Sequence, residues 1–298
     1  MSIDFSGLGV ALATPFTPSG ELDLPGFRKL VRHVAAHADV LVVLGTTGEA
    51  PTILEPERDA LITATLEEAN GRKVVAGTGH NATATAAAMT KRAQTLGVHG
   101  ALVVTPYYNK PTPKGLALHY QALADAAPGL PLIAYNVPGR TALNVLPAGL
   151  ALLWENPQVV AVKESSGNLA QIAEIARTLP PGKQLLSGDD GFALASIAVG
   201  AVGLTSVLGN LLPKEAKALV DAARGGRMEE ARALNQKLLP LMDALFLESS
   251  PIPLKTGLRL LGLAGDTLRL PLSPAEPATV ARLTAALRDL GLDLPGAA

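Results

Sequence analysis

The amino-acid sequence predicts an α/β protein, a (β/α)8 TIM barrel with a small C-terminal helical region. Short apolar runs recur along the first three-quarters of the chain, each as long as a strand buried on both faces. Their spacing of about 20 to 30 residues leaves room for one helix and its loops between strands. After Gly226 the alternation stops and only helical segments follow. We therefore expect a catalytic barrel over residues 1–225 and a helical region over 226–298.

The predicted strands are residues 8–13, 40–44, 74–76, 101–104, 132–134, 159–162, 185–186 and 202–204. Helices are predicted between them at 24–36, 57–69, 81–96, 116–127, 169–179, 192–199 and 214–223, and after the barrel at 228–247, 252–263 and 276–290. Asn81 is the expected N-cap of the third helix. An open doubly wound sheet is the alternative, but it would carry a nucleotide-binding fingerprint near the first strand, where none stands.

Composition excludes several classes of protein. The 298 residues include 25 basic and 26 acidic side chains, so neither a nucleic-acid-binding face nor a polybasic membrane anchor is expected. Hydrophobic residues make up 48%, enough for a sizeable core, yet no apolar run reaches transmembrane length. The absence of cysteine excludes disulfides, thiolate-bound metals and cysteine nucleophiles. With no signal peptide recognisable at the start, we expect a cytoplasmic protein.

Lys163 is the candidate nucleophile, because it follows an apolar run at the carboxyl end of a predicted strand, where barrels of this kind carry their chemistry. An apolar wall disfavours the ammonium form, and a neutral amine can form a Schiff base with a ketone. The alternative is a lysine that extends from the strand end into water. Arg72, Lys73 and Lys183 precede their strands, Lys110 and Lys114 lie in a long loop, and Lys255 lies on a helix. Lys163 is the one lysine directly at the carboxyl end of a predicted strand.

Other polar groups follow strands and should share a face with Lys163. The segment 45–49 (GTTGE) combines glycines with hydroxyls, which suits a small carboxylate-binding nest, although an ordinary loop has the same composition. Tyr135 ends the fifth strand, where a phenol can transfer protons or simply belong to the core. Arg140 follows in a turn-rich loop. An arginine suits carboxylate recognition, but a surface position is the simpler interpretation from spacing alone.

Three further patterns are rejected as sites. The segment 77–82 loosely matches a dinucleotide-binding fingerprint, but Thr105 stands near where an acidic residue would bind ribose. His33 and His37 are spaced i, i+4 on a helix away from the strand ends, so a solvated helix face is expected. Asp189 and Asp190 suit a loop at a helix N-terminus better than a metal site. No metal-binding or cofactor-binding residue is predicted.

Four ordered motifs resemble the pyruvate-dependent class I aldolase family, and within it the dihydrodipicolinate synthases. They are residues 45–49 (GTTGE), 104–109 (VTPYYN), 135–141 (YNVPGRT) and 162–168 (VKESSGN). The similarity runs nearly end to end and includes residues 77–79, 187–190 and 250–255. It implies a lyase that condenses pyruvate with aspartate semialdehyde through a lysine Schiff base, giving 4-hydroxy-tetrahydrodipicolinate in lysine biosynthesis.

The resemblance also implies catalytic roles. Lys163 would form the Schiff base, and Tyr135 would pass protons during imine and carbon–carbon bond formation. Thr46 would link the Tyr135 hydroxyl to Tyr108, which the family supplies from a neighbouring subunit. A homotetramer built from two tight dimers is therefore implied, and no metal or organic cofactor is required.

For substrate binding, the resemblance implies that Thr46 and Thr47 hold the pyruvate carboxylate and that Arg140 holds the carboxylate of aspartate semialdehyde. Gly188 would line the pyruvate pocket. Thr205 stands where many of these synthases carry isoleucine, and its hydroxyl would change the polarity beside the lysine.

The family's lysine-feedback site differs in this chain. Inhibited members carry a glutamate where Thr85 stands, and often histidines in place of Glu55 and Arg58, whereas Asn81 and Tyr107 are retained. Without the carboxylate, the ammonium of a bound lysine lacks its natural partner. We therefore expect lysine to inhibit weakly or not at all.

Two other functions remain open at this point. A 4-hydroxy-2-oxoglutarate or 2-keto-3-deoxy-sugar-acid aldolase would use the same scaffold and lysine, although Arg140 favours the synthase. A non-catalytic barrel that binds a keto acid or a partner protein would not need a lysine, two tyrosines and a threonine on one face.

Overall fold

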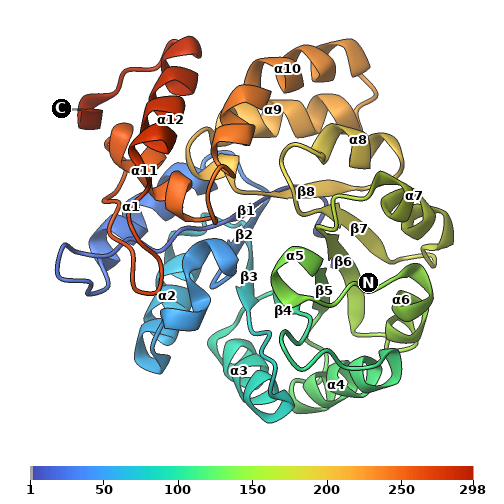
Figure 1. Ribbon diagram of the computed structural model, residues 1–298. Helices are drawn as coiled ribbons and strands as arrows, with labels where there is room; N and C mark the ends of the chain where they lie inside the picture. The colour runs from blue at the N-terminus through green and yellow to red at the C-terminus, as the bar shows by residue number, and fades with distance from the viewer. Residues whose placement is uncertain (1–2, 298) are drawn as a thin grey trace.

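The computed structural model describes residues 3–297, which form eight parallel strands closed into a barrel and surrounded by helices (Figure 1). Strands pair in sequence order, and β1 closes the barrel against β8. The strands are β1 (Gly7–Ala11), β2 (Val40–Val43), β3 (Lys73–Gly77), β4 (Gly100–Val104), β5 (Leu132–Asn136), β6 (Val159–Glu164), β7 (Gln184–Ser187) and β8 (Gly203–Ser206). Every predicted strand is present, so the predicted (β/α)8 architecture is confirmed.

Helices follow the strands in the predicted alternation. Those around the barrel are α1 (Leu24–Ala35), α2 (Glu55–Glu68), α3 (Thr83–Leu96), α4 (Pro113–Ala126), α6 (Pro147–Trp154), α7 (Leu169–Thr178), α8 (Ala193–Ala198) and α9 (Pro213–Arg224). Shorter turns are η1 (Thr46–Gly48), η2 (Ala50–Thr52), α5 (Pro138–Thr141), η3 (Leu208–Asn210) and η4 (Pro295–Ala297). The Asp23 side chain caps α1 by accepting from the Gly26 N–H, and Phe27, Leu30, Val31 and Val34 form its buried face.

The predicted N-cap at Asn81 is wrong. The N-cap of α3 is Ala82, and no side chain caps the helix. The Asn81 carbonyl instead accepts a hydrogen bond of 2.8 Å from Asn109 Nδ2, which ties the β3–α3 loop to the β4–α4 loop. A contact between two loops therefore replaces the local cap.

Two other local predictions also differ from the structure. The Thr112 side chain accepts from the Gly115 N–H and caps α4, so Lys114 lies in the first helical turn and not in a loop. Helix α6 was not predicted, because its sequence PAGLALLW is apolar on nearly every side and lacks an amphipathic period.

Side chains of each strand alternate between the interior of the barrel and the layer beneath the helices. A hydrophobic cluster that fills the interior takes residues from six strands, among them Val42, Val75, Leu102, Ile133, Ala161 and Leu186. A larger cluster packs the barrel against its helices. Lys163 and Tyr135 lie two residues beyond interior positions, and the alternation therefore turns both toward the barrel axis.

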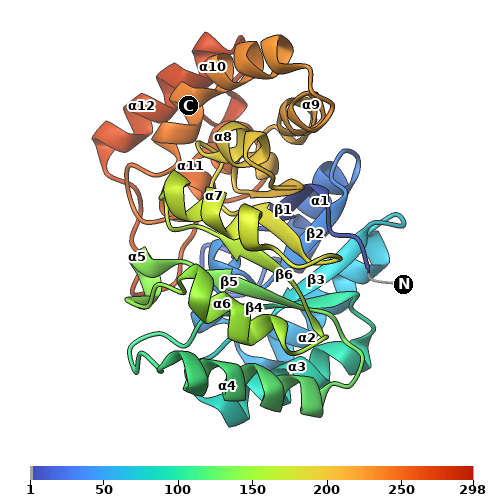
Figure 2. The same cartoon turned by 90° about the vertical axis from the view of Figure 1, so that its right-hand side faces the viewer.

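The C-terminal helical region is present as predicted, with helices α10 (Met228–Ala244), α11 (Ile252–Leu260) and α12 (Pro277–Asp289). Helix α10 packs on α9, and α12 packs on α10 and α11. Figure 2 shows α10 and α12 at the end of the molecule opposite α3 and α4. They share the larger hydrophobic cluster through residues such as Leu241, Leu258 and Leu287. The boundary between residues 225 and 226 stays a prediction.

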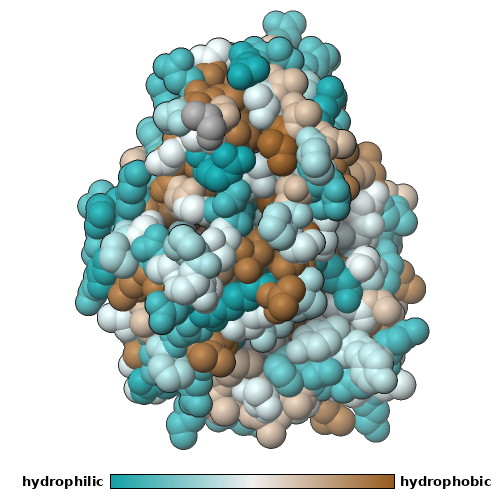
Figure 3. All heavy atoms as spheres, turned by 60° about the vertical axis from the view of Figure 1, so that its left-hand side comes forward, coloured by the Kyte–Doolittle hydropathy of each residue, from teal (hydrophilic) through white to brown (hydrophobic). Residues whose placement is uncertain are grey.

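The surface on the side of the C-terminal helices is mixed in character. Figure 3 shows hydrophobic side chains there in separate patches among hydrophilic ones. Between residues 3 and 297, no helix combines the length and apolar character needed to cross a bilayer.

Candidate active site

Lys163 and Tyr135 lie side by side at the carboxyl ends of their strands. They are register partners in the β5–β6 pair, and both side chains are buried, at 5% and 6% exposure. The Lys163 Nζ atom lies 4.1 Å from the centroid of the Tyr135 ring. The structure thus brings the predicted nucleophile and the predicted proton donor into direct contact.

Gly188 leaves the space that the Lys163 side chain occupies. It follows β7, and its N–H donates to the Glu164 carbonyl over 2.9 Å. A Cβ at this position would lie 2.8 Å from Lys163 Cε and 1.9 Å from Ser165 Oγ, too close for any side chain. This residue must therefore be glycine if the lysine is to keep its conformation.

The carboxylate next to the nucleophile points away from the barrel axis and braces the site. Glu164 is buried, and its carboxylate accepts hydrogen bonds from Asn136 Nδ2 (2.9 Å) and the Ser166 N–H (2.7 Å). Burial raises the pKa of Glu164, whereas these hydrogen bonds act in the opposite direction. The contacts fix the end of β6, and with it the backbone of Lys163.

Thr46 and Thr47 form the helical turn η1 directly after β2. Thr47 is buried, and Thr46 lines the main cavity. The Thr14 hydroxyl donates to the Gly48 carbonyl over 2.9 Å and holds the turn over the end of β1. The first N–H groups of a helical turn have no partner inside it, which leaves them for an anion. The turn therefore has the chemistry expected of a carboxylate-binding nest.

A cavity of ≈ 950 Å³ opens beside these residues. Its walls include Thr46, Tyr135 and Arg140, so three predicted site residues share one space. Arg140 is exposed at the edge, and its Nη2 donates to the Ser250 carbonyl over 3.0 Å. That contact holds the guanidinium at the mouth of the cavity.

The same cavity continues outward between α2 and α3. Glu55, Arg58, Thr85 and Tyr107 line this part, which holds most of the predicted feedback-site residues. The Arg58 guanidinium donates to the carbonyls of Ala50 and Gly77, each over 3.0 Å, and is therefore occupied by backbone.

Tyr108 and Thr205 do not line the cavity that Thr46, Tyr135 and Arg140 share. Tyr108 is 89% exposed, lies in the left-handed region (φ 71°), and makes no side-chain hydrogen bond to Thr46 or Tyr135 within residues 3–297. The predicted hydroxyl chain is therefore not assembled within one subunit. Thr205 is buried in β8, where it pairs with Gly9 inside the barrel.

The rejected patterns have structural explanations. His33 is half-buried, with Nε2 3.3 Å from the Leu211 carbonyl, so only part of that helix face is solvated. Asp189 accepts from the Gly191 N–H in the loop before α8, as predicted, whereas Asp190 accepts from Ser206 and from the N–H groups after β8. In the described part of the chain, no group of three or more His, Asp or Glu side chains is arranged to hold a metal ion.

One ion pair next to the site was not predicted from the sequence. Lys255, set aside as a helical lysine, forms a buried ion pair with Glu49 of the GTTGE segment. Burial lowers the pKa of Lys255 to about 8, although the Glu49 carboxylate acts in the opposite direction. A lysine directly after the apolar run 251–254 was the available signal, but its partner could not be inferred from local spacing.

Comparison with known proteins gives matches over nearly the whole chain. Residues 4–290 match the model of the dihydrodipicolinate synthetase family. The chain is 46% identical to the 4-hydroxy-tetrahydrodipicolinate synthase of Geotalea uraniireducens, covering 97% of this chain and 99% of that protein. Among solved structures, dihydrodipicolinate synthase from Aquifex aeolicus superposes with a TM-score of 0.94 at 40% identity, over 98% of this chain and 100% of that one. The chloride-inhibited enzyme from Acinetobacter baumannii complexed with pyruvate gives 0.94 at 38% identity, over 97% and 100%.

Proposed function

Since the chain belongs to the dihydrodipicolinate synthetase family, we propose that Lys163 performs the chemistry by forming a Schiff base with pyruvate. The activity is that of a 4-hydroxy-tetrahydrodipicolinate synthase, an enzyme of lysine biosynthesis that condenses pyruvate with aspartate semialdehyde. The observation that carries the proposal is the position of the Lys163 amine, buried at the end of β6 against the Tyr135 ring. An amine held there beside a phenol lies where it can attack a ketone, with a proton donor next to it.

In the proposed reaction, the Lys163 amine attacks the ketone carbon of pyruvate, and water leaves as the imine forms. Loss of a methyl proton gives an enamine, whose terminal carbon adds to the aldehyde carbon of aspartate semialdehyde. The amino group of that substrate then displaces Lys163 as the ring closes, which regenerates the free amine. The Tyr135 hydroxyl would carry protons to and from the reacting atoms, and no metal or organic cofactor takes part.

Substrate carboxylates are assigned to two places in this proposal. Thr46 and Thr47 would hold the pyruvate carboxylate, and Arg140 at the mouth of the cavity would hold that of aspartate semialdehyde. Gly188, next to Lys163, would line the pyruvate pocket, and Thr205 would contribute a hydroxyl to the wall of the barrel.

We propose a homotetramer of two tight dimers in which Tyr108 completes the site of the neighbouring subunit. An exposed tyrosine in a left-handed conformation is an unfavourable arrangement for an isolated chain, and a second copy would cover it. Thr46 would then connect this tyrosine to Tyr135. We also propose a cytoplasmic location, which cell fractionation would test.

Borohydride reduction tests the mechanism. Incubation with pyruvate and borohydride should leave a reduced pyruvate adduct on the Lys163 peptide, visible by mass spectrometry. The Lys163→Ala variant should show none, and Lys183→Ala, which changes a lysine at the opposite end of the barrel, should behave like the parent. An unmodified Lys163 peptide under these conditions would refute the Schiff-base proposal.

Arg140→Ala tests which aldehyde the site selects. Removing the guanidinium should lower kcat/KM with aspartate semialdehyde by about 100-fold, as expected for loss of a charge-assisted contact of about 3 kcal/mol, while imine formation with pyruvate persists. Steady-state assays and borohydride trapping measure the two effects separately. Turnover that survived this change would favour an aldolase acting on an uncharged aldehyde.

A further inference from the structure

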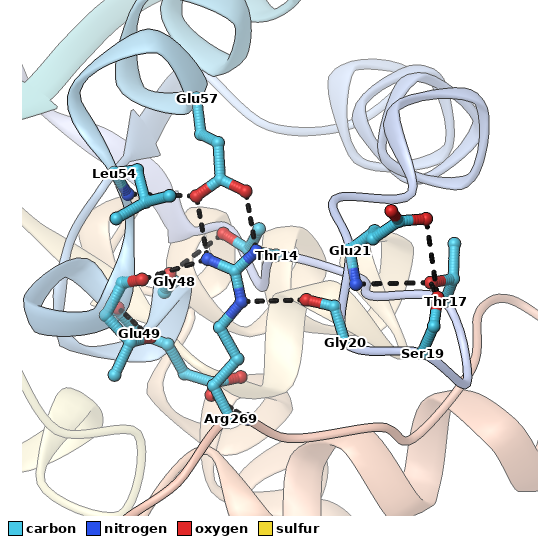
Figure 4. Close-up of polar contacts among 11 residues, drawn as sticks. Thr14, Thr17, Ser19, Gly20, Glu21, Gly48, Glu49, Leu54, Glu57 and Arg269 are labelled. Carbon is cyan, nitrogen blue, oxygen red and sulfur yellow. Dashed lines mark hydrogen bonds and ion pairs between the residues drawn. The ribbon is translucent and has the colours of Figure 1, made fainter.

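Four charged side chains connect the C-terminal region to the turn that carries Thr46 and Thr47. They are Glu49, Glu57, Lys255 and Arg269, referred to below as the tether cluster. Figure 4 shows Glu49, Glu57 and Arg269 converging from the segment after β2 and from the loop between α11 and α12. In Figure 1 that loop, which begins after α11, runs alongside α1 and α2.

The Glu49–Lys255 ion pair is the innermost contact of the tether cluster. Both side chains are at most 1% exposed. Lys255 also donates to the Thr267 carbonyl over 2.8 Å, and its Nζ lies 4.1 Å from the centroid of the Phe16 ring. The ammonium is therefore held on three sides, and Glu49 cannot move without leaving a buried charge unpaired.

Arg269 holds the same segment at two further points. Its backbone N–H donates to Glu49 Oε2 over 3.1 Å, and its Nη1 donates to the Thr52 carbonyl over 2.9 Å. Two nitrogens of the guanidinium bind the Glu57 carboxylate at 2.7 and 2.6 Å, and Nε reaches the Gly20 carbonyl. This residue thus connects the turn after β2 to the start of α2.

The backbone conformation of Glu49 indicates what these contacts do. Its φ of 54° lies in the left-handed region, which a glutamate adopts only when the surrounding structure imposes it. Glu49 directly follows η1, so its conformation sets how Thr46 and Thr47 face the cavity. A buried ion pair contributes little net stability, because desolvation of both charges offsets their attraction. Positioning is therefore the better explanation for keeping one here.

We propose that Glu49, Lys255 and Arg269 are positioning residues that fix the Thr46–Thr47 turn for binding the pyruvate carboxylate. The C-terminal helical region thereby takes part in substrate binding without touching the substrate. This inference rests on the proposed function, because it assumes that the turn receives that carboxylate.

The test compares Lys255→Met, the double variant Glu49→Gln/Lys255→Met, and Arg269→Lys with the parent enzyme. The double variant leaves no unpaired buried charge and therefore guards against a loss of folding. Arg269→Lys keeps the charge but loses the paired contacts to Glu57. Arg259→Met is the matched control, because Arg259 lies one turn from Lys255 on α11 but pairs with Asp266 at the surface.

The expected result is a KM for pyruvate raised at least tenfold in the three test variants, with a KM for aspartate semialdehyde within twofold of the parent. The pyruvate concentration that half-saturates borohydride trapping on Lys163 should rise in parallel, and the control should match the parent. An unchanged pyruvate KM in the folded double variant, or a loss of kcat with both KM values unchanged, would overturn the proposal. Absence of trapping in the parent enzyme would instead refute the Schiff-base mechanism itself.

Discussion

Lys163 owes its position to the residues that touch it. The Tyr135 ring lies against its amine, and Gly188 leaves the space that its methylene chain occupies. Glu164 holds the strand end through hydrogen bonds on the opposite face. These contacts come from β5, β6 and the residue after β7, so the lysine depends on three neighbouring parts of the barrel.

Gly188→Ala should abolish imine formation while leaving the barrel folded. The added methyl would overlap the Ser165 hydroxyl and push against Lys163, at a cost of about 1–3 kcal/mol for overpacking. We expect borohydride trapping to fall at least 100-fold, with a modest decrease in melting temperature. Gly115→Ala, where an added Cβ meets only ordinary contacts, is the control. Partial recovery in Gly188→Ala/Ser165→Ala would confirm the steric cause, whereas normal trapping in Gly188→Ala would contradict it.

Among the helices, α3 and α4 meet at a buried histidine. His119 of α4 is 4% exposed, and its Nδ1 lies 2.9 Å from the Thr83 hydroxyl at the start of α3. Its Nε2 has no hydrogen-bond partner within the described residues. Burial lowers the pKa of His119 to about 4, so the ring is neutral at pH 7.

This histidine should make stability fall as the pH decreases from 6.5 toward 4. In that range the unfolded chain binds a proton at an ordinary imidazole, whereas the folded protein does not, so protonation favours unfolding. The loss from this one group should reach about 2 kcal/mol at pH 5. Urea unfolding at pH 7 and pH 5 measures it, and His119→Gln should remove that part of the pH dependence. An equal dependence in both proteins would rule out the assignment.

The cavity wall between α2 and α3 leads to a prediction about regulation. Thr85 of α3 lines this wall without a carboxylate, and the nearby Arg58 guanidinium is bound to backbone carbonyls. Millimolar lysine should therefore leave activity essentially unchanged. Thr85→Glu should create inhibition by supplying a partner for the ammonium, whereas Thr95→Glu on the exposed face of the same helix should not. Strong inhibition of the parent enzyme in an activity titration would disprove this prediction.

In the whole molecule, Tyr108 is the proposed site residue that lies apart from the others. Lys163 and Tyr135 meet within a subunit, but Tyr108 projects from it and is 89% exposed. The C-terminal region, in contrast, contacts the GTTGE segment of the same chain, because Lys255 and Arg269 both bind Glu49. Under these two proposals, activity would depend on contacts with the C-terminal region of the same chain and on association of subunits.

Mixing two inactive variants tests the sharing of Tyr108. Tyr108→Phe should reduce kcat about 100-fold by interrupting proton transfer, and Lys163→Ala should remove activity. In a co-expressed hybrid, the Lys163→Ala subunit would donate an intact Tyr108 to the intact Lys163 of its neighbour and restore part of the activity. Co-expression of Tyr108→Phe with Lys163→Ala/Tyr108→Phe is the control and should restore none. Failure of the first pair to recover activity, despite forming hybrids, would argue that Tyr108 does not cross between subunits.

The sequence by itself determined the barrel and predicted where its nucleophile lies. Eight short apolar runs alternating with helices admit few architectures, because buried parallel strands need a helical connection between them. The rule that chemistry lies at the carboxyl ends of the strands then singled out Lys163 among the lysines. The GTTGE segment was recognisable because glycines and hydroxyls carry their chemistry locally.

Only the tertiary structure decided the contacts between residues that lie far apart in the sequence. The Asn81 carbonyl binds the Asn109 side chain across two loops, which no local capping rule anticipates. Gly188 is required by the side chains of Lys163 and Ser165, which belong to the neighbouring strand and the loop after it. Lys255 pairs with Glu49, which lies more than half the chain away in sequence. Packing of α11 buries both side chains, and a buried charge is stabilised by a partner of opposite sign. Periodicity and motifs in the sequence reflect local conformational preferences. Contacts such as the Glu49–Lys255 ion pair depend on which side chains are buried together, and that is decided only when the chain folds.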